Sequence, residues 1–345
     1  MKILICGFVS ERCMEFAKEL RRIGHEVDIV DRKECKDMVK KKKYDIIHEN
    51  GYLFDCYCLK LGKKLGIPTI LQIDDYWLET TQSPLSKIIN FYALIWCKRF
   101  ANLAKKIFVP CFELREKLIK EWKLLDDKVE VIPDGVPIEK FRQNVDCSDV
   151  VEKYNLKGFK VVLFVGSVGC SSSASNALSG LIYLIRAIPI ILSRVENLKV
   201  IVVGGYVEEN IMEYLSEETS KLRIGEVIKF CGIAPHDDVP KYISASDVCV
   251  AFEPSAKRIF EYMACGKPVV AQKNDFIKEI IEDGKEGYLL NMKNKFELAR
   301  IITTILLNDD MAKEIGENCR KKVLEKYSWE GVTNKLIETY RKAMV

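Results

Sequence analysis

Short apolar runs rich in β-branched residues alternate along the chain with longer segments of helical period. This alternation is typical of parallel sheets whose two faces are covered by helices. The first apolar run, residues 2–7, ends in Gly7, and residues 10–23 follow it with apolar positions at helical spacing. Further strands are predicted at residues 26–30, 45–48, 69–73, 106–109 and 129–132. Together these elements predict one complete doubly wound unit.

The same pattern starts again after a polar stretch at residues 144–149. A second buried run, residues 160–165, ends in Gly166, and a third, residues 198–203, ends in a pair of glycines. Strands at residues 227–230, 248–251 and 268–271 continue the series. The two strand-then-glycine starts lie about 160 residues apart. The sequence therefore predicts two α/β units of similar size, residues 1–148 and residues 149–326.

The composition is that of a folded globular protein, because 48% of the 345 residues are hydrophobic and 30% are charged. The net charge is only +4, but residues 1–145 carry 27 basic and 22 acidic side chains. The N-terminal half is therefore the part expected to meet an anionic surface or acceptor. No basic stripe interleaved with aromatic residues is present in the sequence, which argues against a nucleic-acid partner.

The 13 cysteines include no C-x-x-C pair, and the spacing of Cys56 and Cys58 is poorly suited to tetrahedral zinc. With three histidines in the chain, the sequence predicts no structural metal site, but free and mostly buried thiols in a reducing cytosol. The first residues run straight into a strand without a cleavable signal. The longest apolar stretch, residues 181–192, is broken by Arg186 and too short to cross a bilayer. A cytoplasmic location is expected.

An aromatic and basic stretch at residues 87–106 offers a second interpretation of the N-terminal half. Its composition is compatible with an amphipathic helix that lies against a membrane surface. Packing of the same aromatic residues in the core is the favoured alternative. Peripheral membrane contact through the N-terminal domain therefore stays open at this stage.

The most informative segment surrounds the strand predicted at residues 248–251. This strand leads into a loop with Glu253, Ser255 can cap the following helix, and Glu261 lies about two turns into that helix. Free amides at the start of a helix suit a diphosphate, to which Arg258 in the first turn can add a bidentate contact. Glu253 and Glu261 can therefore hold different ends of one extended ligand. The alternative for both is a pair of solvated carboxylates flanking a helix start.

This segment resembles the E-x7-E signature of the retaining family-four glycosyltransferases, in the version F-E-P-S-P-L-K-I-F-E-Y-M-A-C-G-K-P-V-V-A, from which it departs at residues 256–258. Shorter strings extend the resemblance over almost the whole chain, in the family's order: Gly24-His-Glu-Val27, Gly66-Ile-Pro-Thr69, Val131-Ile-Pro-Asp-Gly-Val136, Val203-Gly-Gly205, Phe230-Cys-Gly232 and Lys326-Tyr-Ser-Trp329. The resemblance implies a GT-B fold, in which two Rossmann-like domains with doubly wound parallel sheets face each other across a cleft. Residues 1–148 would form the acceptor domain, residues 149–326 the nucleotide-sugar-binding domain, and residues 327–345 a helix that crosses back to the first domain.

The resemblance also implies roles for single residues. Glu261 would hold the ribose hydroxyls of the nucleotide, and Glu253 would face the donor sugar or assist the reacting centre. Backbone amides near Ser255 and Arg258 would bind the diphosphate, and Gly7 would let the backbone approach phosphates or acceptor without a Cβ. The remaining residues implied around the donor are Gly166, Ser167, Gly204, Cys231, Gly232, Lys257 and Ile259. No metal ion and no cofactor are expected, because amides and basic side chains would stabilise the departing diphosphate.

Two departures from the family pattern affect these roles. The family has an arginine and a lysine after the strand that matches residues 160–165, whereas residues 166–180 contain no basic side chain. The family also has a histidine after the strand that matches residues 69–73, where this chain has Asp74. Asp74 can take a base or hydrogen-bonding role, with turn formation as the alternative. His48, one strand earlier, is the better candidate for a histidine in the cleft, with a structural histidine as the alternative.

The sequence thus predicts a retaining glycosyltransferase that moves a sugar from a nucleoside diphosphate sugar to a hydroxyl acceptor. The expected acceptor is a glycan or a lipid-linked saccharide presented by the basic N-terminal half. Two alternatives remain, which are a non-catalytic sugar-nucleotide binder or partner subunit and a nucleotide-sugar epimerase of the same fold. The missing arginine and lysine motivate the first, and the small number of histidines weakens the second.

Overall fold

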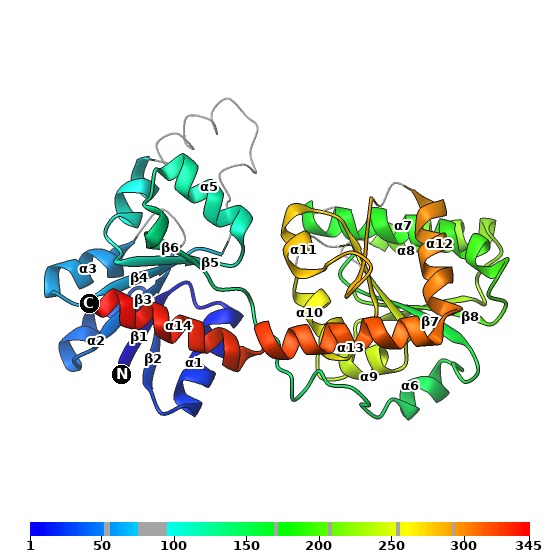
Figure 1. Cartoon of the computed structure of the whole chain (residues 1–345), viewed down its shortest axis with the longest axis horizontal. Helices are drawn as coiled ribbons and strands as arrows, with labels where there is room; N and C mark the ends of the chain where they lie inside the picture. The colour runs from blue at the N-terminus through cyan, green and yellow to red at the C-terminus, as the bar shows by residue number, and fades with distance from the viewer. Residues whose placement is uncertain (52–55, 75–94, 169–171, 206–208, 253–255, 292–293) are drawn as a thin grey trace. The chain divides into compact units, whose positions relative to one another are not determined.

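A computed structural model of the chain describes all residues except 52–55, 75–94, 169–171, 206–208, 253–255 and 292–293 (Figure 1). The described residues form two compact units. Unit 1 combines Met1–Gly135 with Trp329–Val345, and unit 2 spans Val136–Ser328. Each unit has its own sheet with helices on both faces (Figure 1).

Unit 1 contains β1 (Lys2–Gly7), α1 (Glu11–Arg22), β2 (Glu26–Asp31), α2 (Cys35–Lys41), β3 (Ile46–Asn50), α3 (Tyr57–Leu65), β4 (Thr69–Gln72), β5 (Lys106–Val109), α5 (Phe112–Trp122), the 3-10 helix η2 (Asp126–Lys128), β6 (Val129–Val131) and α14 (Trp329–Met344). Its six strands are parallel and lie in the order β2-β1-β3-β4-β5-β6. Side chains alternate between the two faces of each strand, so one strand contributes to two separate layers of core. Ile3 and Ile5 of β1 pack with α1 and α14, whereas Leu4 and Cys6 pack with α2 and α3.

Unit 2 contains α6 (Ser148–Lys153), β7 (Lys160–Val165), α7 (Ser172–Leu192), β8 (Leu198–Val203), α8 (Glu209–Lys221), β9 (Ile228–Gly232), α9 (Val239–Ser244), β10 (Val248–Ala251), α10 (Lys257–Ala264), β11 (Val269–Gln272), α11 (Asp275–Ile280), β12 (Gly287–Leu290), α12 (Lys295–Leu306) and α13 (Asp309–Lys326). Its strands are also parallel, in the order β12-β11-β10-β7-β8-β9. Val162 and Phe164 of β7 pack with α7, α8 and α12, whereas Val161 and Leu163 face α9, α10 and α13.

The two parallel six-stranded sheets confirm the predicted pair of doubly wound units. Five strands, β1, β5, β7, β8 and β10, have the predicted bounds. The pattern did not predict β12, because its short apolar run after Gly287 is no longer than many loop segments. The chain passes into unit 2 after Gly135 rather than near residue 148. The reason is that Val136 and Phe141 are buried in the core of unit 2.

The last helix, α14, completes unit 1. Its buried side chains recur every three or four residues, so they line one face of the helix. That face packs against α1 and the strands, where the Trp329 and Phe16 rings meet edge to face with centroids 5.3 Å apart. A Cβ on Gly135 would lie 2.7 Å from Cε3 of Trp329, so the chain can pass this ring only with a glycine.

The stretch at residues 87–106 lies partly outside the described residues. Residues 95–101 are helical, and Cys97 and Phe100 are buried there while Ile95 and Trp96 are about half exposed. Core packing therefore accounts for one side of this helix, and contact of the other side with a membrane stays a prediction. Among the helices that the structure describes, each is too short or too polar to cross a bilayer.

Candidate functional sites at the carboxyl edges of the two sheets

Ligands of open parallel sheets bind beyond the carboxyl ends of the strands, at the point where the strand order reverses. In unit 2 this point lies between β7 and β10, because β8 and β9 continue to one side of β7 and β11 and β12 lie beyond β10. Gly166 and Ser167 follow β7 here, and α10 begins soon after β10. Ser167 is exposed at this edge, whereas Gly166 is buried.

Glu261 is the central polar side chain of this edge. It is only 1% exposed, and both carboxylate oxygens accept hydrogen bonds. Arg258 Nη1 donates to Oε2 at 2.6 Å, and His236 Nε2 donates to Oε1 at 2.8 Å. Lys140 Nζ donates to the other ring nitrogen of His236 at 3.1 Å. Because the Lys140 ammonium group can only donate, this ring nitrogen accepts, and the Nε2–H of His236 points at Glu261.

Helix α10 brings Glu261 to the switch point through its neighbour Tyr262. The buried Tyr262 hydroxyl accepts a hydrogen bond from the Val165 amide at 2.9 Å, which ties α10 to the end of β7. Two details of the helix differ from the prediction. Ala256, not Ser255, occupies the N-cap position, and Glu261 lies about one turn into the helix, not two. The helix starts at Lys257, one residue later than a Ser255 cap would give.

The other predicted donor residues belong to α10, to the loop before it and to the end of β9. Lys257 and Arg258 are partly exposed in the first turn of α10, but the Ile259 side chain is in the core, so only its main-chain amide could meet a ligand. Glu253 and Ser255 lie outside the described residues. Cys231 and Gly232 end β9 as half-buried residues, and the Ile233 side chain after them is 82% exposed. Burial raises the pKa of the Cys231 thiol, so this group is not activated for reaction.

Close approach of neighbouring strand ends explains two predicted glycines. Gly7 has φ of +103°, and a Cβ there would overlap the Asn50 carbonyl at the end of β3. Gly204 has φ of +150°, and a Cβ there would overlap the carbonyl of Gly166. Packing within each sheet edge therefore requires these glycines whether or not a ligand binds, and their donor roles stay predictions.

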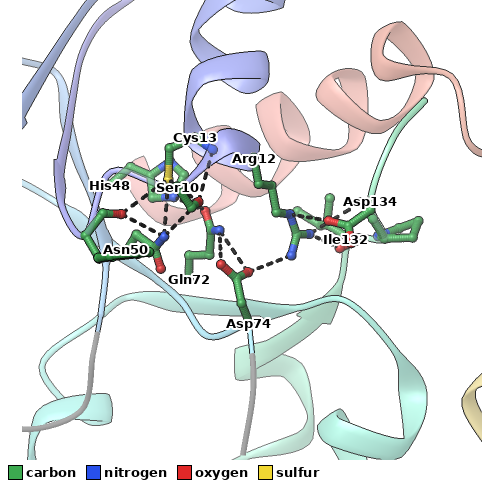
Figure 2. Close-up of polar contacts among 11 residues, drawn as sticks. Ser10, Arg12, Cys13, His48, Asn50, Gln72, Asp74, Ile132 and Asp134 are labelled. Carbon is green, nitrogen blue, oxygen red and sulfur yellow. Dashed lines mark hydrogen bonds and ion pairs between the residues drawn. The ribbon is translucent and has the colours of Figure 1, made fainter. Parts of the chain in front are cut away.

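The edge of unit 1 carries a network around Asp74, shown in Figure 2. Gln72 Nε2 donates to the two Asp74 oxygens at 2.8 and 2.7 Å, and Arg12 Nη1 donates to Oδ1 at 2.7 Å. Arg12 is 7% exposed and also pairs with Asp134 at 3.2 Å. The Asp74 side chain is 36% exposed. Gln72 and Arg12 therefore fix the position of the carboxylate, while part of it stays accessible to a ligand.

His48 belongs to the buried end of the same network and does not reach a ligand. It is 0% exposed, its Nε2 lies 2.8 Å from Gln72 Oε1, and its Nδ1 lies 2.8 Å from the Tyr340 hydroxyl. The Gln72 NH₂ group donates to Asp74, so Gln72 Oε1 accepts the hydrogen bond from His48 Nε2. His48 Nδ1 then accepts from the Tyr340 hydroxyl. Burial lowers the pKa of His48 to about 4, which keeps the ring neutral. The prediction of a histidine in the cleft is therefore wrong for His48, whose role is to position Gln72.

The lowered pKa of His48 predicts an acid-sensitive contribution to stability. The unfolded chain takes up a proton at His48 near the ordinary pKa of about 6.5, whereas the folded protein resists protonation until about pH 4. Stability is therefore lost as the pH falls through this window. We therefore compare the free energy of unfolding of wild type with that of His48→Gln at each pH. Between pH 7 and pH 4, wild type should lose up to about 3 kcal/mol more than the variant. Urea denaturation measures this difference, and parallel pH profiles for the two proteins would contradict it.

Several residues of these edges carry no signal that sequence reasoning detected. Arg12 and Gln72 belong to a helix start and a strand end without a motif, and Tyr340 lies 292 residues from its partner His48. His236 stands in no motif of the sequence either, although it contacts Glu261 directly. Its position four residues after β9, beyond a strand end, is the one feature that could have identified it.

Comparison with known proteins covers both units. Residues 154–322 match the family model described as glycosyl transferases group 1, and residues 31–140 match the model of glycosyltransferase family 4. An uncharacterised glycosyltransferase of Methanocaldococcus jannaschii is 25% identical over 99% of this chain and 95% of its own length. An Escherichia coli UDP-Gal:alpha-D-GlcNAc-diphosphoundecaprenol alpha-1,3-galactosyltransferase is 22% identical over 88% of this chain and 76% of its own length.

Two solved structures share the fold of the whole chain. HepE of Anabaena, crystallised with UDP, superposes with a TM-score of 0.77 at 20% identity, covering 99% of this chain and 100% of its own. A glycosyltransferase of Rickettsia africae gives a TM-score of 0.79 at 20% identity, covering 99% and 98%. With matching family models over both sheets and the E-x7-E segment beside the switch point of unit 2, the chain belongs to the family 4 (group 1) glycosyltransferases and has their GT-B fold.

Proposed function

We propose that the protein is a retaining glycosyltransferase that moves a sugar from a nucleoside diphosphate sugar to a hydroxyl group of a glycan or a lipid-linked saccharide. The observation that carries the proposal is the buried carboxylate of Glu261, held between Arg258 and His236 at the switch point of unit 2. A carboxylate in this position suits the adjacent hydroxyls of a ribose, because each oxygen keeps a lone pair after accepting one hydrogen bond.

Donor binding in this proposal exchanges the partners of Arg258. Glu261 is 1% exposed, so a ribose can reach it only when Arg258 or His236 moves, and the side chains of these two residues are 26% and 38% exposed. Ribose hydroxyls that replace Arg258 on the carboxylate would release the guanidinium for the diphosphate. The first-turn amides of α10, including that of Ile259, would supply further donors. This arrangement would offset the absence of basic side chains from residues 166–180 without a metal ion or cofactor.

The acceptor is proposed to bind at the edge of unit 1. Asp74 is a partly exposed carboxylate of that edge, and Gln72 and Arg12 fix its orientation. A positioned carboxylate can accept the hydrogen bond of an incoming hydroxyl and take up its proton. Glu253, which lies outside the described residues, keeps its proposed role beside the donor sugar.

A screen of ligands tests the function. Anabaena HepE has been crystallised with UDP-glucose, so UDP and UDP-glucose are the first ligands to compare with GDP, ADP and TDP and their sugars. A ligand that binds the folded state raises the unfolding temperature by mass action, and we expect one nucleotide to do so selectively. Incubation with the sugar of that nucleotide and candidate acceptors should then release free nucleotide and form a glycoside with the donor's anomeric configuration, as read by NMR. An altered sugar would indicate an epimerase, and binding without turnover would indicate a sugar-nucleotide binder.

A further inference from the structure

Three cysteines from separate elements of unit 1 come together behind its sheet. Cys6 lies in β1, Cys35 is the first residue of α2, and Cys58 is the second residue of α3. Their Sγ atoms all lie within 4.8 Å of one another. The three side chains are 1%, 0% and 0% exposed. The cluster lies on the face of the sheet that packs with α2 and α3, opposite the face that holds α1 and α14.

A buried carboxyl group with unused hydrogen-bonding capacity stands beside the thiols. Glu49 in β3 is the register partner of Cys6, and partners on parallel strands point to the same face. Its Oε2 accepts a hydrogen bond from the Leu59 amide at 2.7 Å, whereas its Oε1 has no hydrogen-bond partner among the described residues. Glu49 is 0% exposed, so this oxygen has no access to solvent. A buried acceptor without a partner is costly and indicates a ligand or an ordered group at the cluster.

Three buried sulfur atoms and the Glu49 carboxyl group lie on the same face of the sheet, so they form one set of groups around a common centre. A cation bound by the sulfurs would favour the anionic form of all three cysteines and of Glu49.

We propose that Cys6, Cys35 and Cys58 bind one thiophilic cation, Zn²⁺ or Cu⁺, that joins β1, α2 and α3 of unit 1. Metal–sulfur bonds of about 2.3 Å place three sulfurs around one ion about 4 Å apart, which the observed cluster can reach with small side-chain shifts. Soft thiolate ligands select these metals over Mg²⁺ or Ca²⁺. As each metal–sulfur bond forms, a thiol gives up its proton to solvent, and no electron is transferred. The sequence prediction of no metal site considered spacing along the chain, whereas these ligands come from three elements.

The full-length chain, purified anaerobically with reductant and stripped with a chelator, provides the test. We expect it to bind one equivalent of Zn²⁺, or one of Cu⁺ supplied under anaerobic conditions, as measured by elemental analysis after gel filtration. Replacement by Cd²⁺ should give the ultraviolet absorption of thiolate-to-metal charge transfer. Cys35→Ser and Cys58→Ser should lose both signals. The matched control is Cys249→Ser, which changes a fully buried cysteine of unit 2 and should retain both.

A second variant keeps the test decisive if the serine variants do not fold. Glu49→Gln removes the carboxylate but no sulfur ligand, and we expect it to fold and to weaken metal binding about 10- to 100-fold, as loss of a partner next to a metal ligand does. The bound metal should also raise the unfolding temperature of wild type, and a chelator should reverse this effect. Retention of neither cation by wild type, equal loss in Cys249→Ser, or a disulfide between two of the three cysteines in the reduced preparation would overturn the proposal.

Discussion

Replacing Glu261 by alanine is expected to weaken binding of the cognate nucleoside diphosphate about 10- to 100-fold. A hydrogen bond to a charged group contributes about 1.5–3 kcal/mol, and the net loss of one such bond to a ribose hydroxyl corresponds to this change. The variant also leaves Arg258 and His236 without the carboxylate that both contact. Isothermal titration calorimetry with the nucleotide chosen by the ligand screen measures the effect. An unchanged dissociation constant would remove Glu261 from the donor site.

The control must separate binding from stability, because Glu261 is buried and its loss will also destabilise unit 2. Glu286 is a matched residue, since it is 3% exposed and pairs with Lys322 at 3.1 Å in the same unit. It precedes β12, at the amino end of the sheet's edge strand and away from the switch point. Glu286→Ala should lower the free energy of unfolding in urea and leave nucleotide affinity unchanged. Equal losses of affinity in both variants would mean that stability, not a ribose contact, explains the result.

Removing α14 is expected to unfold unit 1 and leave unit 2 folded. Deletion of residues 329–345 exposes the apolar face that α14 covers, and five large side chains are lost with it: Trp329, Val332, Leu336, Ile337 and Tyr340. Each contributes about 1.5–3 kcal/mol on burial, so the loss is of order 10 kcal/mol and comparable to the whole stability of a domain. Limited proteolysis with mass spectrometry should show cleavage throughout residues 1–135 and protection of residues 136–328.

The matched truncation ends the chain after Ala343. It removes Met344 and Val345, whose side chains are exposed, and should leave the protease pattern of wild type unchanged. Resistance of unit 1 in the longer deletion would show that α1 and the sheet form a stable core without α14. Loss of unit 2 in the same deletion would show that the two units do not fold separately.

The local pattern of apolar residues predicted the sheets well, because buried parallel strands appear in the sequence as continuous β-branched runs, here ending in glycine. The runs before Gly7 and Gly166 and the segment around Glu261 each carry their information within a few residues. Several side-chain partners at the two sites, in contrast, lie far away in the sequence. His236 meets Glu261 from 25 residues away, and Tyr340 meets His48 across almost the whole chain. Such pairs depend on the packing of helices against sheets, which spacing along the chain does not encode.

The same reason accounts for the error at His48 and for the cysteine cluster that the sequence did not reveal. A histidine at a strand end looks the same in sequence whether it faces solvent or a helix, and here the α14 side chain Tyr340 covers it. Cysteines 6, 35 and 58 show no metal-binding spacing because each comes from a different secondary-structure element. Sequence reasoning therefore identified where a ligand is expected to bind, but not which groups hold the surrounding side chains in place.

The discontinuity of unit 1 has a consequence for synthesis on the ribosome. Residues 1–135 emerge before unit 2, yet the helix that covers their apolar face is translated after unit 2. All of unit 2 is made in between and can fold as soon as it leaves the exit tunnel, because its residues are contiguous. The nascent N-terminal segment must therefore keep an uncovered surface until α14 has left the exit tunnel, and during this interval it is exposed to aggregation and to chaperones.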